Sequence, residues 1–135
     1  MIYIFEVYLI ICVLFLAGKD ADSYQLKDRQ DNNLSAGRVK RWHRDGVTLF
    51  ILYLLPLAAW HPALWWKVLV SAALVRLSLF DLAFNKWAGL SIHYLGGTAR
   101  FDKIAARIFG INGAVLKSSV FLALLIALNV LNFSL

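Results

Sequence analysis

Three side chains in the middle of the chain have the chemistry of an acid–base site: Asp81, Asn85 and His93. An aspartate or a histidine can act as a general base, and an amide can orient a substrate. Asp81 and Asn85 are four residues apart, which places them on one face of a helix. They lie within an apolar segment, where an acid is energetically costly and needs a partner. Asp81, Asn85 and His93 are therefore the candidate catalytic residues.

A second group of residues has the chemistry to hold a phosphate. Gly96, Gly97 and Thr98 come directly before a predicted helix, and Arg100 and Lys103 lie in its first turn. The free backbone donors at a helix N-terminus bind anions, and basic side chains beside them add charge. The alternative is an ordinary capped helix whose charged side chains are solvated.

No metal or cofactor site is predicted. The single cysteine, Cys12, excludes an intramolecular disulfide and a cysteine-based zinc site. The histidines and acids do not have the paired helical spacing of motifs such as His-Glu-x-x-His. A haem held by His43 and His93 is disfavoured because both lie outside the apolar segments.

Composition indicates the kind of protein that positions these residues. Of the 135 residues, 61% are hydrophobic and 16% are charged, whereas about a quarter of the residues in an ordinary soluble domain are charged. The apolar residues are gathered into segments that approach the roughly 20 residues needed for a helix to cross a hydrocarbon layer. We therefore predict an all-α fold, an integral membrane helical bundle in a single domain.

Four segments have the composition of transmembrane helices. They cover residues 2–18, 46–60, 63–87 and 113–133. The first also has the length of a secretory signal peptide, although no basic residue precedes its apolar part. Pro56 is expected to kink the second helix, and His61-Pro62 to form the tight turn into the third.

The third segment carries a polar stripe. At about 100° per residue, five polar side chains fall on one side of its helix, namely Lys67, Ser71, Ser78, Asp81 and Asn85. Such a stripe is typical of hydrogen bonds between packed membrane helices or of a water-accessible site. We expect Asp81 to face protein or water, and Arg76, on the opposite side, to snorkel or to bond to a carbonyl or acid on another helix.

The basic residues predict the orientation in the membrane. Of 14 basic residues, seven lie between Lys19 and Arg44 and four between Lys86 and Arg107. The positive-inside rule places the polar loop 19–45 and the segment 88–110 in the cytoplasm, and both termini outside. The expected location is a bacterial inner membrane. The expected partners of these basic residues are anionic lipid head groups, not nucleic acid.

Two helices have faces suited to contacts with lipid or with other helices. Residues 99–109 form an amphipathic helix with Ile104 and Ile108 on its apolar side, which predicts a cytoplasmic-side interfacial helix. In the last segment Ser119, Ala123 and Ala127 repeat every four residues, which predicts a small-residue face for close helix approach. Asn129 and Asn132 near its far end are expected to bond to a partner helix or to reach the interface.

Two resemblances bear on function. The run Gly96-Gly97-Thr98-Ala99-Arg100 is similar to part of the CDP-alcohol phosphotransferase signature, but Ile92 and Leu95 stand at positions that need metal-binding aspartates, which excludes that chemistry. The pattern from Phe80-Asp81-Leu82-Ala83-Phe84-Asn85 to Tyr94, Thr98, Asp102 and Lys103 resembles small uncharacterised multi-pass membrane proteins of bacteria and phages. That resemblance implies a membrane fold and carries no activity.

The leading functional prediction is a non-enzymatic accessory, interaction or structural component of a membrane. It would pack its helices within itself, against a membrane-protein partner or against a second copy. An enzyme or binder acting on lipid head groups at the cytoplasmic leaflet is the first alternative, and a pore or holin-like protein is the second. The enzyme alternative requires the polar stripe and the Gly96-Gly97 turn to meet in one water-accessible pocket.

Overall fold

The regular secondary structure of the protein is all helical in the part of the chain described by its structure, a computed structural model. The structure describes residues 2–30, 36–60, 65–95, 100–110 and 112–133, and within these the side chains of residues 5–24, 46–57, 59, 65–95, 103–110 and 112–130. Five helices and no strands occur in these ranges. The helices are α1 (Ile2–Gln30), α2 (Ala36–Trp60), α3 (Trp65–Ala88), α4 (Arg100–Phe109) and α5 (Ala114–Phe133).

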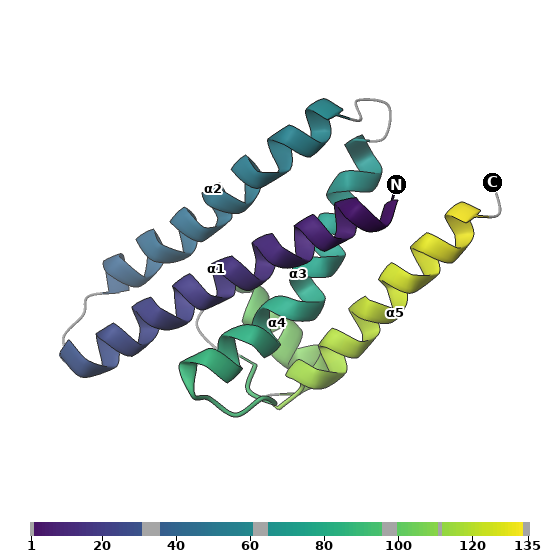
Figure 1. Cartoon of the computed structure of the whole chain (residues 1–135). Helices are drawn as coiled ribbons and strands as arrows, with labels where there is room; N and C mark the ends of the chain where they lie inside the picture. The colour runs from purple at the N-terminus through teal and green to yellow at the C-terminus, as the bar shows by residue number, and fades with distance from the viewer. Residues whose placement is uncertain (1, 31–35, 61–64, 96–99, 111, 134–135) are drawn as a thin grey trace.

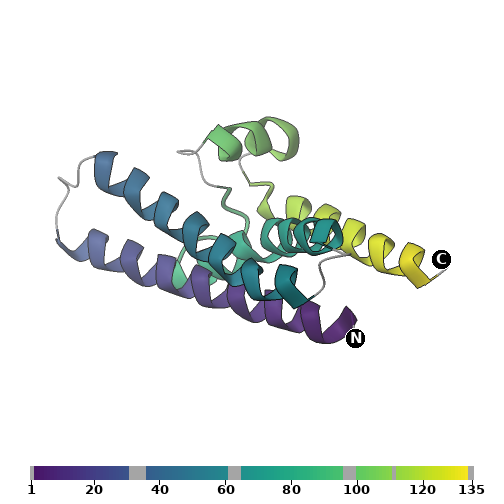
Figure 2. The same cartoon turned by 90° about the horizontal axis from the view of Figure 1, so that it is seen from above.

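Helix α3 is the central element of the bundle. It packs against α1, α2 and α5, and α1 also packs against α2. The N-terminal ends of α1 and α3 and the C-terminal ends of α2 and α5 lie at the same end of the molecule (Figure 1, Figure 2). Helix α4 contacts only α5 among the described helices and stands to one side of the bundle (Figure 2).

The polar segment predicted as a loop over residues 19–45 is mostly helical. Helix α1 continues to Gln30 and α2 already begins at Ala36. Residues 19–30 contain no proline or glycine, and their Ala, Leu, Lys, Arg and Gln residues favour helix. A polar composition showed where an apolar segment ends, but it did not show where the helix ends.

The remaining helices begin and end close to the predicted apolar segments. Helices α3 and α5 nearly coincide with residues 63–87 and 113–133, and the interfacial segment contains α4. Helix α2 continues through Pro56 without a break. The turn predicted at His61-Pro62 lies outside the described residues.

The core lies where α1, α2 and α3 meet, with a contribution from α5. It consists of buried apolar side chains: Leu9, Val13 and Leu16 of α1, Phe50 and Leu54 of α2, Ala72 and Val75 of α3, and Leu125 of α5. A second, smaller cluster joins α4 to the start of α5 through Leu95, Ala105 and Ala114. Helix α4 is therefore held by the second cluster and takes no part in the main core.

By length and composition, one described helix is able to cross a membrane, namely α3 over Trp65–Ala88. A second candidate is a bent pair, Lys103–Phe109 of α4 with Ala114–Val130 of α5, whose two arms differ in direction by 90°. Gly46–Leu57 of α2 forms a shorter apolar helix. The structure thus establishes a helical protein with one candidate span among its described helices.

Candidate functional site

The polar stripe of α3 faces the interior of the bundle. Ser71, Ser78 and Asn85, spaced seven residues apart, are all buried. The hydroxyl of Ser78 donates to the carbonyl oxygen of Val75 at 3.0 Å, within its own helix. A seven-residue spacing returns to almost the same side of a helix, so these small polar groups line one contact face.

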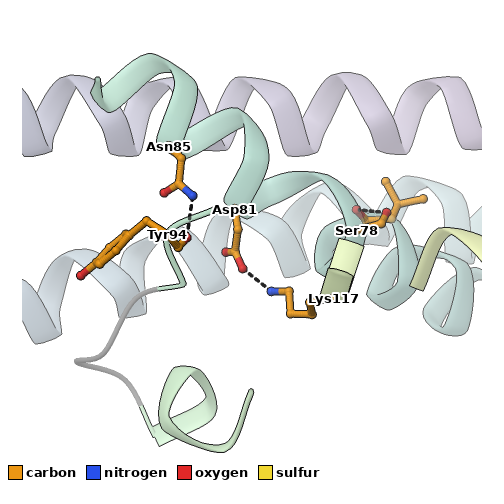
Figure 3. Close-up of polar contacts among 6 residues, drawn as sticks. Ser78, Asp81, Asn85, Tyr94 and Lys117 are labelled. Atoms are coloured by element: carbon orange, nitrogen blue, oxygen red, sulfur yellow. Dashed lines mark hydrogen bonds and ion pairs between the residues drawn. The ribbon is translucent and has the colours of Figure 1, made fainter. Parts of the chain in front are cut away.

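Asp81 forms an ion pair with Lys117 of α5 (Figure 3). The Lys117 side chain is only 4% exposed and that of Asp81 is 26% exposed. The expectation that Asp81 needs a partner is met by a residue that the sequence analysis did not consider. Lys117 is the single charged residue of α5. A lone charge in the first turn of an otherwise apolar helix was the sequence signal that could have identified it as the partner of Asp81.

The backbone around the start of α5 positions Lys117. The amide of Ala114 donates to the carbonyl of His93 at 3.2 Å, and the amide of Lys117 donates to the carbonyl of Gly113 at 2.8 Å. The segment that follows α3 therefore holds the first turn of α5 beside the end of α3. This places Lys117 opposite Asp81.

Asn85 closes the turn after α3. Its side-chain amide is buried and donates to the carbonyl oxygen of Tyr94 at 2.6 Å (Figure 3). The amide of Leu90 donates to the Asn85 carbonyl at 2.8 Å, and Gly89 supplies a positive φ of 73°. Asn85 thus ties the connecting segment to α3, a positioning role for the candidate catalytic amide.

His93 is not joined to Asp81 or Asn85 by its side chain. Its imidazole is exposed, and its backbone amide donates to the Ser91 hydroxyl oxygen at 3.4 Å. The carbonyl of His93 contributes to the α5 contact described above. Of the three candidate catalytic residues, the structure brings Asp81 and Asn85 to one end of α3 and gives each a partner within the chain.

The candidate phosphate-binding residues are only partly described. Gly96, Gly97 and Thr98 lie outside the described residues, and for Arg100 only its helical backbone is described. Lys103 is exposed on α4. The predicted convergence of these five residues on a phosphate therefore stays a prediction.

Arg76 lies among aromatic rings inside the bundle. Its guanidinium lies over the rings of Phe50, at 5.2 Å, and Phe80, at 4.4 Å. Cations stacked on aromatic faces are stabilised by the ring quadrupole, more so away from water. The sequence predicted that Arg76 snorkels or bonds to a carbonyl or acid of another helix; the contact that it makes with another helix is instead to the Phe50 ring of α2.

Asp20 of α1 is a further acidic side chain inside the bundle and is almost fully buried. A Cβ placed on Gly46 of α2 would lie 3.4 Å from its Oδ2, so Gly46 lies directly beside the Asp20 carboxylate.

At the other end of the bundle, polar contacts join α1 to its neighbours. Asn129 of α5 donates from Nδ2 to Glu6 Oε1 at 2.5 Å and to the Leu125 carbonyl at 3.1 Å. The Tyr8 hydroxyl donates to the carbonyl of Tyr53 on α2 at 3.2 Å. The prediction that Asn129 bonds to another helix is confirmed.

The small-residue face of α5 is not covered by the described part of the chain. Ser119, Ala123 and Ala127 are all exposed. The face that packs on the bundle is marked by buried side chains, among them Lys117, Ser118 and Leu125. Within this chain, the ion pair with Asp81 and the contact of Asn129 set the rotation of α5, and the small residues are left outside.

Comparison with protein-family models, with curated proteins and with solved structures finds no match to this chain. Its function is therefore inferred from the geometry above, a helical bundle whose polar side chains pair between helices.

Proposed function

We propose that the chain is a four-span integral membrane protein and a non-enzymatic interaction component of the membrane. In this proposal α1, α2, α3 and α5 cross the bilayer and α4 lies at its surface. The observation that carries the proposal is the distribution of side chains: charged and amide groups pair between helices inside the bundle, and large apolar side chains cover its outside.

The apolar surface extends over all four proposed spans. Its members are at least two-fifths exposed and include Val7, Ile11 and Phe15 of α1, Val47, Ile51 and Leu55 of α2, Leu69 and Val70 of α3, and Leu122, Ile126 and Val130 of α5. A soluble monomer rarely exposes contiguous apolar patches larger than a few hundred Å². In hydrocarbon the same surface is favourable, and interior polar pairs are then ordinary contacts between helices.

Helix α3 has the dimensions of a span. Exposed indoles lie at its two ends, Trp65 and Trp66 at the start and Trp87 near the end. At a rise of 1.5 Å per residue, Trp65 and Trp87 are about 33 Å apart along the axis, close to the roughly 30 Å of a bilayer core. Indoles are enriched at both membrane interfaces, so both ends of α3 have the expected anchors.

Exposed basic side chains give the orientation. Lys19, Lys86, Lys103 and Arg107 are exposed, and Lys86 lies in the last turn of α3. The positive-inside rule assigns that end to the cytoplasm, which leaves the N-terminus of α1 and the C-terminus of α5 outside. A bacterial inner membrane fits this arrangement.

The exposed small-residue face of α5 supports an interaction role. Ser119, Ala123 and Ala127 let a second helix approach closely, and no described helix of this chain occupies that face. The enzyme alternative is less well supported, because Asp81 and Asn85 have partners inside the protein. We therefore place the partner helix, from another membrane protein or a second copy, on this side of α5.

Membrane insertion is tested by alkaline extraction combined with cysteine labelling. The native Cys12 is replaced by serine, and single cysteines are introduced at Lys19 and Lys67, toward opposite ends of the proposed spans. The protein should stay in the alkali-washed membrane. A membrane-impermeant maleimide should label residue 67 in intact cells and residue 19 only after lysis. Release by alkali, or labelling of residue 19 from outside, would overturn the proposal.

The interaction role is tested by blocking the small-residue face. Ala123→Phe places a ring where close approach is needed, whereas Leu124→Phe alters the next exposed position and is the matched control. Both variants should fold, since both positions are exposed. Native electrophoresis of mild-detergent extracts should show an assembly that Ala123→Phe reduces to the single chain and Leu124→Phe preserves. Identical migration of both variants would contradict the interaction role.

A further inference from the structure

Helix α4 presents a face that combines apolar and basic side chains and that the described part of the chain leaves exposed. Ile104 and Ile108 are 55% and 69% exposed, and Lys103 and Arg107 are exposed as well. Residues four positions apart lie on the same side of a helix. The isoleucines therefore form one short stripe and the basic residues a second stripe beside it.

The opposite side of α4 fixes its position on the protein. Ala105 is buried against Leu95 and Ala114, with Ala106 and Phe109 packed beside them. Gly110, with a φ of 80°, ends the helix. A Cβ on Gly113 would overlap the carbonyl group of Phe109, so only glycine fits this close return of the chain. The stripes of Ile104 and Lys103 are thus held in a defined orientation.

That orientation is the one expected of a helix lying on a membrane. The axis of residues 103–109 is turned 90° from that of residues 114–130 in α5. If α5 runs along the membrane normal, α4 lies in the membrane plane. Lys86 and Trp87, at the C-terminal end of α3, are both exposed. The segment 89–95 that follows them is bonded to the start of α5 through the His93 carbonyl and the Ala114 amide. An indole and a lysine at the end of a membrane helix are typical interfacial anchors.

We infer that α4 binds the head groups of anionic phospholipids, with Ile104 and Ile108 in the acyl-chain boundary and Lys103 and Arg107 on the phosphates. The inference rests on the proposed membrane function and names the lipid class that this surface takes. Charge complementarity identifies the occupant: α4 has three basic residues, Arg100, Lys103 and Arg107, and one acidic residue, Asp102, and the exposed Lys103 and Arg107 lie beside the apolar stripe. Interfacial helices bind through buried apolar area together with attraction to anionic lipid.

The size of the electrostatic effect can be stated as a ratio. Each Lys or Arg near an anionic surface contributes about 1 kcal/mol, which is roughly a fivefold preference for that surface. Removal of both cations should therefore reduce the preference of α4 for anionic over zwitterionic lipid by roughly 25-fold. The attraction to the charged surface falls off within a Debye length, which shortens as salt is added, so the preference should also weaken at high salt.

The test measures the depth of α4 in the full-length protein. A nitroxide is attached to a cysteine replacing Ile108 in a Cys12→Ser background, and the protein is placed in nanodiscs of phosphatidylcholine with or without phosphatidylglycerol. Accessibility to oxygen and to a water-soluble nickel complex reports the depth of the label. We expect a lipid-buried label with phosphatidylglycerol and a shallower one in phosphatidylcholine alone.

Charge-removing variants identify the residues responsible. Lys103→Gln with Arg107→Gln should abolish the difference between the two lipid compositions. Lys67→Gln, which removes a lysine from the first turn of α3, should preserve it. A label at residue 108 that is water-exposed in both compositions, or a lipid difference that survives the double substitution, would overturn the inference.

A second label separates this inference from the proposed function. A nitroxide at Leu69, exposed on α3, should be deeply lipid-buried in both lipid compositions. If the label at residue 69 is buried and that at residue 108 is in water, the lipid inference fails and the membrane proposal stands. If residue 69 is itself in water, the membrane proposal fails.

Discussion

Breaking the Asp81–Lys117 pair should destabilise the protein asymmetrically. Loss of one partner of a buried pair leaves an uncompensated charge and costs about 3 to 5 kcal/mol when both groups are buried. Here Lys117 is 4% exposed, whereas Asp81 is 26% exposed and can recover some hydration. Asp81→Asn strands the deeper charge and should cost about 3 kcal/mol, whereas Lys117→Met should cost about 1 to 2 kcal/mol.

The double variant gives the decisive comparison. Asp81→Asn with Lys117→Met removes both charges, and replacement of a buried pair by uncharged groups is often close to neutral. We expect the double variant to be more stable than Asp81→Asn alone, with a coupling energy of about 1 to 3 kcal/mol, the range found for residues in contact. The sign of this coupling distinguishes a buried pair from two independent polar groups.

The free energy of unfolding is measured in mixed detergent micelles by the loss of helical circular dichroism. Lys86→Met serves as the control, because Lys86 is exposed in the last turn of the same helix as Asp81. A change within about 0.5 kcal/mol is expected there. Effects of the two single substitutions that add to within about 0.5 kcal/mol in the double variant would refute the pairing.

Three further predictions concern other contacts. Asn85→Leu removes the 2.6 Å hydrogen bond to the Tyr94 carbonyl and should lower the free energy of unfolding by about 1 to 3 kcal/mol. Hydrogen exchange should rise in residues 90–95 while the middle of α3 stays protected. Unchanged exchange in residues 90–95 would count against the role of Asn85. Asn129→Leu removes the hydrogen bond to Glu6 and should lower the free energy of unfolding by about 1 to 2 kcal/mol. Chemical unfolding measures this beside the control Leu128→Ile, a nearly neutral apolar change. Equal stability of the two variants would contradict the contact. Gly113→Ala forces a Cβ against Phe109 and should detach α4 from the start of α5, which faster proteolysis near residue 110 would report. Gly18→Ala is the control, because its Cβ meets Trp87 at an ordinary 3.6 Å, and it should leave proteolysis unchanged.

The amino-acid sequence was sufficient to predict several features of the bundle. The seven-residue spacing of Ser71, Ser78 and Asn85 indicated one polar face on α3, and the structure buries that face. The cost of an acid among apolar residues required a partner for Asp81. Both conclusions depend on the repeat of a single helix or on the solvation of one side chain, which are local properties.

Two features were not predicted, for different reasons. The helix ends at Gln30 and Ala36 were missed because a polar segment that contains good helix formers can extend a helix beyond its apolar part, a local property that the loop prediction did not weigh. The face by which α5 packs on the bundle could not be predicted, because it depends on how the helices are placed relative to one another: Ser119, Ala123 and Ala127 are exposed, although their spacing suits close packing.

The sequence by itself determined the helical class, the presence of a polar face on α3 and the need of Asp81 for a partner. Only the tertiary structure decided that the partner is Lys117, that Asn85 holds the Tyr94 carbonyl, and that Arg76 lies between Phe50 and Phe80. The physical reason is that a periodic pattern defines the faces of one helix. The partner of each face depends on the depth and rotation of its neighbours, and these are set by all the contacts of the bundle together.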